Sequence, residues 1–228
     1  METPLTAAAP ASARVPSLMR LALPGLFLPG SFILFGLGAV VLQPFLSLLL
    51  SSSAVEAAQL PVMGVALIAG GALWGRALGL DFAVGIRRRM ALAAALSHIA
   101  LVLLAGVVLG RLEEDLVGAG HSPLPLHQLF TALFVPATAI VCAGMSAAVG
   151  LAAGGRRLAG RLAWRGALAG AAAFLIANVI QDLLGRRVGG PNAAETATMI
   201  SVMFIANTCA ALAMTAAIAR ALRAARPE

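Results

Sequence analysis

Residues 90–110 read MALAAALSHIALVLLAGVVLG, a continuous apolar run whose one ionisable side chain is the imidazole of His98. At a rise of about 1.5 Å per residue, a helix of this length crosses the roughly 30 Å hydrocarbon core of a bilayer. A helix bonds its own backbone polar groups, which lipid cannot satisfy. The run therefore predicts a transmembrane helix.

Five further apolar runs of similar length occupy residues 31–50, 60–80, 129–153, 166–184 and 197–219. The 228-residue chain is 61% hydrophobic and 11% charged, whereas a soluble domain is about 45–50% apolar and about 25% charged. This composition excludes a soluble enzyme and a disordered chain. The sequence predicts an all-α fold: a polytopic membrane helix bundle with six transmembrane helices.

The predicted bundle is a single domain at residues 17–222, between cytoplasmic tails at residues 1–16 and 223–228. Residues 17–30 are apolar but interrupted by Pro24 and Pro29, and they are too short to cross a bilayer alone. We expect this segment to be an interfacial lead-in or a kinked extension of the first helix at residues 31–50.

All 16 basic residues are arginine, and their distribution predicts the orientation. Short cytoplasmic loops carry an excess of basic residues. With the N-terminus inside, every arginine except Arg111, Arg186 and Arg187 is cytoplasmic, and Trp74 and Trp164 fall at the inner interface. We therefore expect both termini to be cytoplasmic.

The abundance of alanine and glycine, with arginine in place of lysine, suggests a bacterial source, so we expect a multi-pass protein of the inner (plasma) membrane. The loop arginines account for the net charge of +7, and we expect the lipid bilayer, not nucleic acid, as their environment.

Glycines spaced four apart predict close helix contacts, because association in lipid depends on backbone approach at small residues. Gly71, Gly75 and Gly79 form the longest series. We expect it to line a helix–helix seam or to contact a second copy or another membrane subunit. Shorter pairs, each of which chance could also produce, occur at Gly106 and Gly110, Gly150 and Gly154, and Gly166 and Gly170.

Three prolines bear on the helices. Pro44 and Pro136 fall inside expected crossings, where each removes an intrahelical hydrogen bond and should kink the helix. Pro61 is expected in the first turn of its helix, where its missing N–H costs nothing.

Polar side chains at membrane depth are the first candidates for function because they are costly there unless paired. Gln43, His98 and Asn207 fall within apolar runs and could line a midplane pocket. The alternative, which we favour, is that each bonds a neighbouring helix and serves packing.

A second candidate site lies at the outer end of the fifth crossing. Asn178, Asp182 and Arg186 are four apart and share one helix face. They could form an outer mouth that attracts cations. An ion pair that ends the helix at the membrane surface is the interpretation we favour.

The segment between Arg111 and His127 is expected to be an outer loop. Its weak metal-ligand candidates are His121, His127 and Glu114, beside Glu113 and Asp115. Because their spacing matches no metal signature, we favour a solvated acidic loop, and we expect no metal and no cofactor.

Function is not identified by any motif in the chain. His-Glu-x-x-His, Gly-x-Ser-x-Gly and the phosphate-binding Gly-x-x-x-x-Gly-Lys are missing from the sequence, and no acid lies mid-crossing to relay protons. We expect a non-enzymatic scaffold, accessory or assembly subunit of a membrane complex. The alternative is a small-solute permease or a membrane-embedded substrate-binding subunit of an uptake system, and an enzyme is the weakest hypothesis.

Overall fold

The computed structural model describes residues 18–36, 52–117, 126–188 and 194–225, and within them every regular element is helical. The chain begins with α1 (Leu18–Ala22) and the 3-10 turn η1 (Leu23–Leu26), which leads into helical residues 27–36. We call residues 18–36 the N-terminal helix. The long helices are α3 (Ser52–Leu78), α4 (Val84–Val117), α5 (Leu126–Gly154), α6 (Arg156–Val188) and α7 (Ala194–Ala224).

Six of these helices are long and apolar enough to cross a membrane, which confirms the all-helical, multi-pass prediction. The candidate spans are Met19–Gly36, Gln59–Leu78, Val84–Leu112, Thr131–Gly154, Arg156–Ile180 and Phe204–Ala224.

The first candidate span differs from the expected one. The chain stays helical through Pro24 and Pro29, because Pro24 falls at the start of the η1 turn, where its missing donor is tolerated. The expected lead-in is therefore part of the first long helix. The expected crossing at 31–50 is described only as far as Gly36, and Gln43 and Pro44 lie outside the described residues.

Two further expectations about helix ends were wrong. Pro61 is not in a first turn, because α3 begins at Ser52 and includes the polar stretch before the apolar run. The expected outer loop begins later than Arg111, because α4 stays helical to Val117. The helix α3 therefore begins before its apolar run, and α4 ends after its apolar run. Pro136 lies inside α5, as expected.

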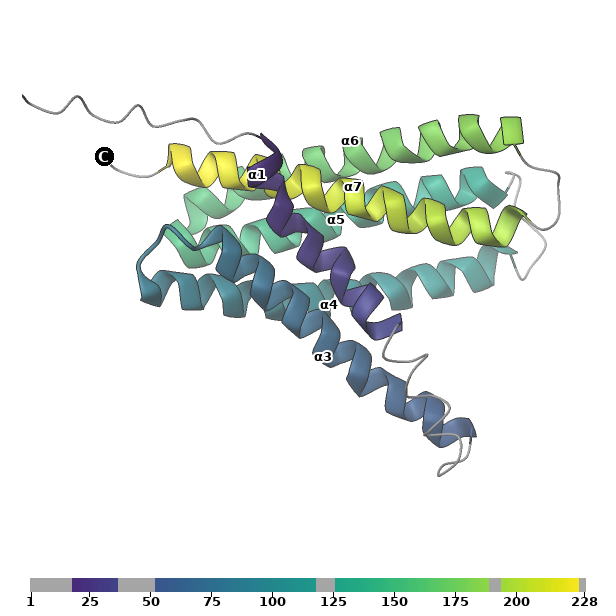
Figure 1. The fold of residues 1–228 in the computed structure, drawn as a ribbon, viewed down its shortest axis with the longest axis horizontal. Coiled ribbons are helices and arrows are strands. Elements are labelled where there is room, and N and C mark those ends of the chain that lie inside the picture. Colours follow the sequence, from purple (N-terminus) through teal and green to yellow (C-terminus); the bar gives the residue numbers. More distant parts are fainter. Residues whose placement is uncertain (1–17, 37–51, 118–125, 189–193, 226–228) are drawn as a thin grey trace, which may run out of the picture.

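Each long helix packs against the next in chain order, from α3 to α7. The N-terminal helix packs against α7 and, through η1, against α3. In Figure 1 it runs obliquely across the bundle, from the end that carries the C-terminus toward the opposite end. The first and last helices are thereby joined.

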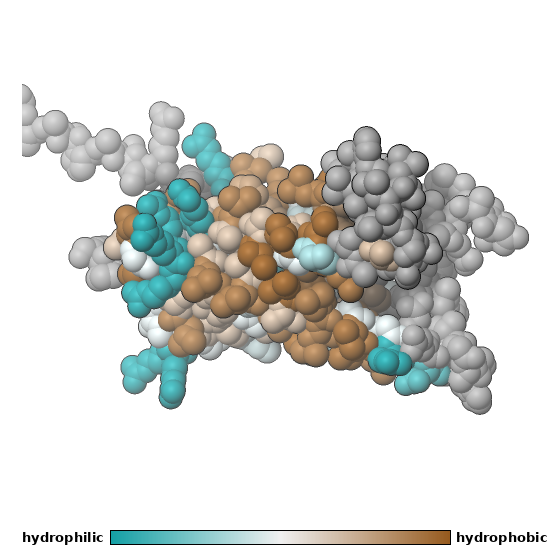
Figure 2. Space-filling view, turned by 90° about the horizontal axis from the view of Figure 1, so that it is seen from below, coloured by the Kyte–Doolittle hydropathy of each residue, from teal (hydrophilic) through white to brown (hydrophobic). Residues whose placement is uncertain are grey.

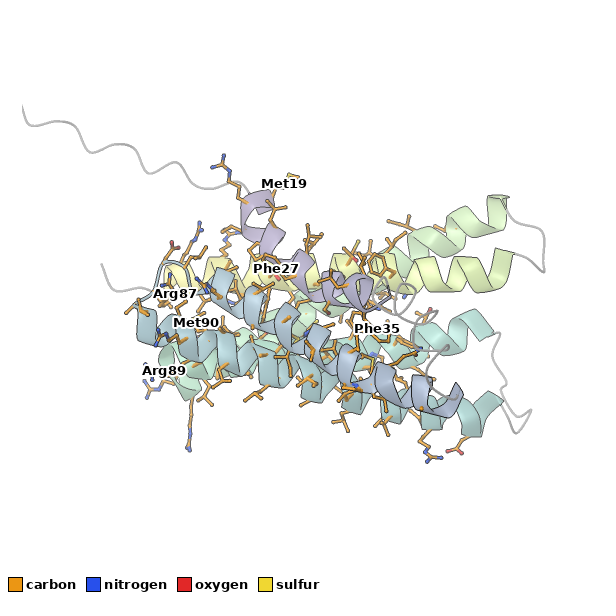
Figure 3. All side chains as sticks on the ribbon, turned by 60° about the horizontal axis from the view of Figure 1, so that its bottom comes forward. Met19, Phe27, Phe35, Arg87, Arg89 and Met90 are labelled. Atoms are coloured by element: carbon orange, nitrogen blue, oxygen red, sulfur yellow. The ribbon has the colours of Figure 1, made fainter. Side chains whose placement is uncertain are left out.

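One end of the bundle, here called the arginine end, gathers basic side chains. It is formed by the junctions α3–α4 and α5–α6, the C-terminal end of α7 and the start of the N-terminal helix. Figure 2 shows hydrophilic residues at this end and a hydrophobic surface across the middle, and Figure 3 places Arg87 and Arg89 there. Its exposed arginines include Arg20, Arg76, Arg88, Arg89, Arg156, Arg157, Arg161, Arg165, Arg220 and Arg223.

Of the side chains that the structure describes, most buried ones lie in the half of the bundle nearest the arginine end, and Phe174, Ala177 and Ala206 extend the buried surface beyond it. On α6 buried residues form one stripe at four-residue spacing, which faces α5 and α7: Leu158, Leu162, Gly166, Gly170 and Phe174. The largest cluster joins Leu158 and Leu162 of this stripe to Trp74, Met90, Met145, Met214 and Ile218 from the other helices, whereas Phe174 belongs to a second cluster with Ala177, Ala206 and Ala210. The described side chains are therefore most tightly packed in this half.

Glycines permit the closest helix contacts, at a seam between α3 and α4. A Cβ atom added at Gly71 would lie 2.7 Å from the carbonyl oxygen of Ala94, and one at Gly75 would lie 2.6 Å from the Ala94 Cβ. Gly79 ends the series beside Arg87, at 3.1 Å from its Cα. The glycine series thus forms a seam within one chain, and α4 already covers the face on which a second subunit was expected.

The other glycine pairs separate into buried and open ones. Gly150 meets Ala159 on α6, with 2.7 Å between an added Cβ and the Ala159 Cα, and Gly166 faces Ser146 on α5. By contrast, Gly106 and Gly110 on α4 have no described atom within 4 Å of an added Cβ. Glycines four residues apart therefore do not all lie at a helix–helix contact.

A single residue, Gly155, separates α5 from α6. Its φ of +84° lies in the left-handed region that glycine enters without a steric penalty. Backbone bonds continue on both sides, from Gly155 N–H to the Leu151 oxygen and from Ala159 N–H to the Gly155 oxygen. The two helices therefore form a hairpin with almost no loop.

The glycine seam predicts a contrast between two substitutions on facing helices. Gly71→Leu should destabilise the bundle by about 1–3 kcal/mol or more, because its side chain would collide with α4 backbone. Gly106→Ala should be neutral or slightly stabilising, because the site is open and alanine favours a helix. Unfolding of both variants in detergent, followed by circular dichroism, measures the difference. Equal stability of the two would contradict the seam.

Candidate functional site

His98, the candidate with the most complete surroundings, lies on the face of α4 that packs against α3. Its side chain is 2% exposed, and its Nδ1 lies 2.8 Å from the carbonyl oxygen of Leu67. Gly71 makes this approach possible, since a Cβ there would lie 2.9 Å from the His98 Cβ. The imidazole therefore bridges two helices at the glycine seam.

The hydrogen-bond partner of Nδ1 determines which nitrogen of the His98 ring carries the hydrogen. A carbonyl oxygen only accepts, so Nδ1 carries a hydrogen and donates it to Leu67. Phe32 of the N-terminal helix meets the imidazole edge-on, with ring centroids 6.4 Å apart and an interplanar angle of 82°. The His98 side chain therefore contacts both α3 and the N-terminal helix. Within the described residues, no carboxylate or second imidazole lies beside it to act as an acid–base partner.

A second polar link joins α3, α7 and η1. Trp74 Nε1 donates a hydrogen bond of 2.8 Å to Thr215 Oγ1, which donates in turn to the Ala211 carbonyl oxygen at 2.6 Å. Gly25 of η1 lies against the same group, because a Cβ there would be 2.8 Å from Thr215 Oγ1. Trp74 is fully buried within the bundle, whereas Trp164 is 66% exposed, and the depth of both at the inner interface stays a prediction.

Sequence reasoning missed Thr215, although it accepts the hydrogen bond that ties the Trp74 indole on α3 to α7. Nothing in the sequence separates Thr215 from Thr208, which bonds the Phe204 carbonyl of its own helix. The distinguishing signal is the indole on another helix, which a single sequence does not place.

The structure describes two of the three midplane candidates, and they lie on different helices. His98 is buried between α4 and α3, whereas Asn207 is exposed on α7. The helix α4 packs against α3 and α5, whereas α7 packs mainly against α6 and the N-terminal helix. Gln43, the third candidate, lies outside the described residues.

The outer-mouth candidates all fall on α6, which extends to Val188. Asn178, Asp182 and Arg186 therefore share a helix face, as their spacing predicts. Asn178 is half-buried, and the side chains of the other two lie outside the described residues. Their pairing stays a prediction.

Few of the metal-ligand candidates have side chains that the structure describes. Asp115 is exposed near the end of α4, and His127 falls in the first turn of α5. His121 and the side chains of His127, Glu113 and Glu114 lie outside the described residues. Where the structure does describe the chain, no three potential ligands lie close enough to hold a metal ion.

The buried hydroxyl groups bond backbone carbonyls of their own helices. Ser31 donates to Leu28, and Ser146 donates to Cys142. Such bonds satisfy a polar group at membrane depth without using another helix. Cys142 and Cys209 are free thiols, the first of them buried.

Comparison with known proteins gives no relative: no family model matches the sequence, and no curated protein or solved structure shows a significant match. The candidate roles therefore rest on the geometry of this chain.

The Trp74–Thr215 bond predicts different effects for two threonines on one helix. Thr215→Val should cost about 1 kcal/mol, because it leaves a buried indole N–H without an acceptor. Thr208→Val should change stability by less than about 0.5 kcal/mol. The comparison is made by reversible unfolding in mixed micelles.

A Trp74→Phe background supplies the control. There Thr215→Val should cost much less, because no indole remains to lose its partner. If the cost is unchanged, the threonine does not act through Trp74.

Proposed function

We propose that this chain is a non-enzymatic scaffold, accessory or assembly subunit of a membrane complex. Its expected place is the bacterial inner membrane, with both termini in the cytoplasm. The gathering of exposed arginines at one end of the bundle supports this orientation, because basic residues are retained on the cytoplasmic side.

The observation that carries the proposal is the bond between His98 Nδ1 and the Leu67 carbonyl oxygen, at 2.8 Å in a buried seam. A permease that used this imidazole would need it on the wall of a solute path. Here its surroundings are Gly71, Ala94 and Phe32, at packing distance. A polar group bonded this way holds helices together.

The permease alternative needs a cavity at midplane depth, lined by His98, Asn207 or Gln43. His98 is buried between α3 and α4, and Asn207 lies exposed on α7. The arrangement of the described residues therefore favours the scaffold hypothesis over the permease.

A second subunit needs a surface that the chain itself does not cover. The outer half of α4 provides Gly106 and Gly110, with nothing described within 4 Å, flanked by exposed Leu103, Leu104 and Val107. Exposed glycines at this spacing allow another helix to approach closely. This face replaces the α3 glycines as the expected contact with a second copy or another membrane subunit.

Native mass spectrometry from mild detergent tests the proposal. The chain should appear bound to a second copy or to another membrane protein. Gly106→Leu together with Gly110→Leu should abolish that species, because the added side chains separate the helix backbones. The fold should remain intact, since the sites are open.

Gly85→Leu is the matched control, because Gly85 lies on the same helix, is also exposed and has nothing described within 4 Å of an added Cβ. It should leave the assembly unchanged. A monodisperse monomer that retains a metabolite would contradict the proposal and favour the permease.

A further inference from the structure

The first turns of α6 have an exposed face that takes no part in the contacts described above. Arg157 and Arg161 are exposed, and Trp164 is 66% exposed. At 3.6 residues per turn these three side chains fall within about 60° of one another around the axis. The opposite side of α6 carries the buried stripe from Leu158 to Phe174, so this face points away from the bundle.

The face changes in character along the helix axis. Arg157 lies about 10 Å before Trp164, at about 1.5 Å per residue. Beyond Trp164 comes one further exposed arginine, Arg165, and the exposed side chains after it are apolar, beginning with Leu168 and continuing with Leu175 and Ile176. The order of arginine, tryptophan and aliphatic side chains matches the order of headgroup, interface and hydrocarbon in a bilayer.

The arginines on this face have no protein counter-charge in the part of the chain that the structure describes. No carboxylate there pairs with Arg157, Arg161 or Arg165, and the first turn of α6 contains no acid. Three guanidinium groups and a helix N-terminus therefore present one sign of charge. A negative partner has to come from outside the described chain.

Space for that partner lies beside the tryptophan. Gly160, one turn before Trp164, is exposed and has no described atom within 4 Å of an added Cβ. Gly160 therefore leaves the surface beside Arg157 and Trp164 without a side chain. A lipid phosphate placed there would lie next to Arg157, with the acyl chains of the lipid running along Trp164 and Leu168.

We infer that this face of α6, formed by Arg157, Arg161, Arg165 and Trp164, binds the headgroup of an anionic phospholipid in the surrounding bilayer. Arginine suits this role because its planar fork binds phosphate through two hydrogen bonds. The exposed indole places the site at the depth of the headgroups. The other tryptophan, Trp74, is buried, so the α3–α4 arginines lack such a neighbour.

Quenching of tryptophan fluorescence by brominated lipid tests the inference in the intact chain. The protein is reconstituted in phosphatidylcholine vesicles that contain the same low fraction of either brominated phosphatidylglycerol or brominated phosphatidylcholine. A Trp164→Phe variant leaves only Trp74 and supplies the background. The remaining signal reports the lipid next to Trp164.

Brominated phosphatidylglycerol should quench Trp164 more strongly, with a local enrichment of about fivefold for each arginine engaged, the equivalent of about 1 kcal/mol near an anionic surface. Arg157→Gln, Arg161→Gln and Arg165→Gln together should remove the preference. Arg76→Gln, Arg88→Gln and Arg89→Gln remove the same charge from exposed positions at the same end, and should preserve it.

Two results would overturn the inference. Equal quenching of the native chain by both lipids would mean that these arginines do not bind the anionic headgroup. An acidic segment of another protein would then be the alternative partner. Equal loss of preference in the two triple variants would mean that the whole arginine end attracts lipid, without a site on α6. If a triple variant fails to fold, Arg161→Gln and Arg88→Gln, which each remove one charge, are compared in the same way. Only Arg161→Gln should weaken the preference for brominated phosphatidylglycerol.

Discussion

Close contact between helix backbones is the constraint on which this bundle depends. Lipid tails are as apolar as the side chains they would replace, so packing and hydrogen bonds have to hold the helices together. Gly71 and Gly75 bring α3 against α4, and Gly150 brings α5 against α6. The bond from His98 to Leu67 exists only because the first of these seams is so narrow.

Packing and charge are concentrated in the same half of the molecule. The Trp74–Thr215 bond, the His98–Leu67 bond and the largest buried cluster all lie in the half nearest the arginine end. The exposed α6 arginines therefore lie on a helix whose opposite side is packed against α5 and α7. The opposite half leaves Gly106 and Gly110 uncovered by any described residue. The two proposed contacts, with lipid and with another subunit, therefore use different ends of the bundle.

The apolar runs could predict the helices because each run is long enough to need a crossing, and α4 to α7 contain their predicted segments. Their ends could not be predicted, since polar residues such as those after Ser52 continue a helix beyond its apolar part. Spacing identified glycine pairs but not their neighbours, and so could not distinguish Gly71, which faces backbone, from Gly106, which is open. Trp74 and Trp164 occupy similar positions in the sequence pattern, yet only the three-dimensional packing buries one and exposes the other.

The single-residue link at Gly155 has a consequence for biosynthesis. Because one residue joins the two helices, α5 and α6 can move apart at this end only if the first turn of α6 unwinds. Once both helices have formed, we expect them to lie in the bilayer as one hairpin. The arginines that open α6 would then stay at the surface from the outset, and would hold the pair in place while α7 is still being synthesised.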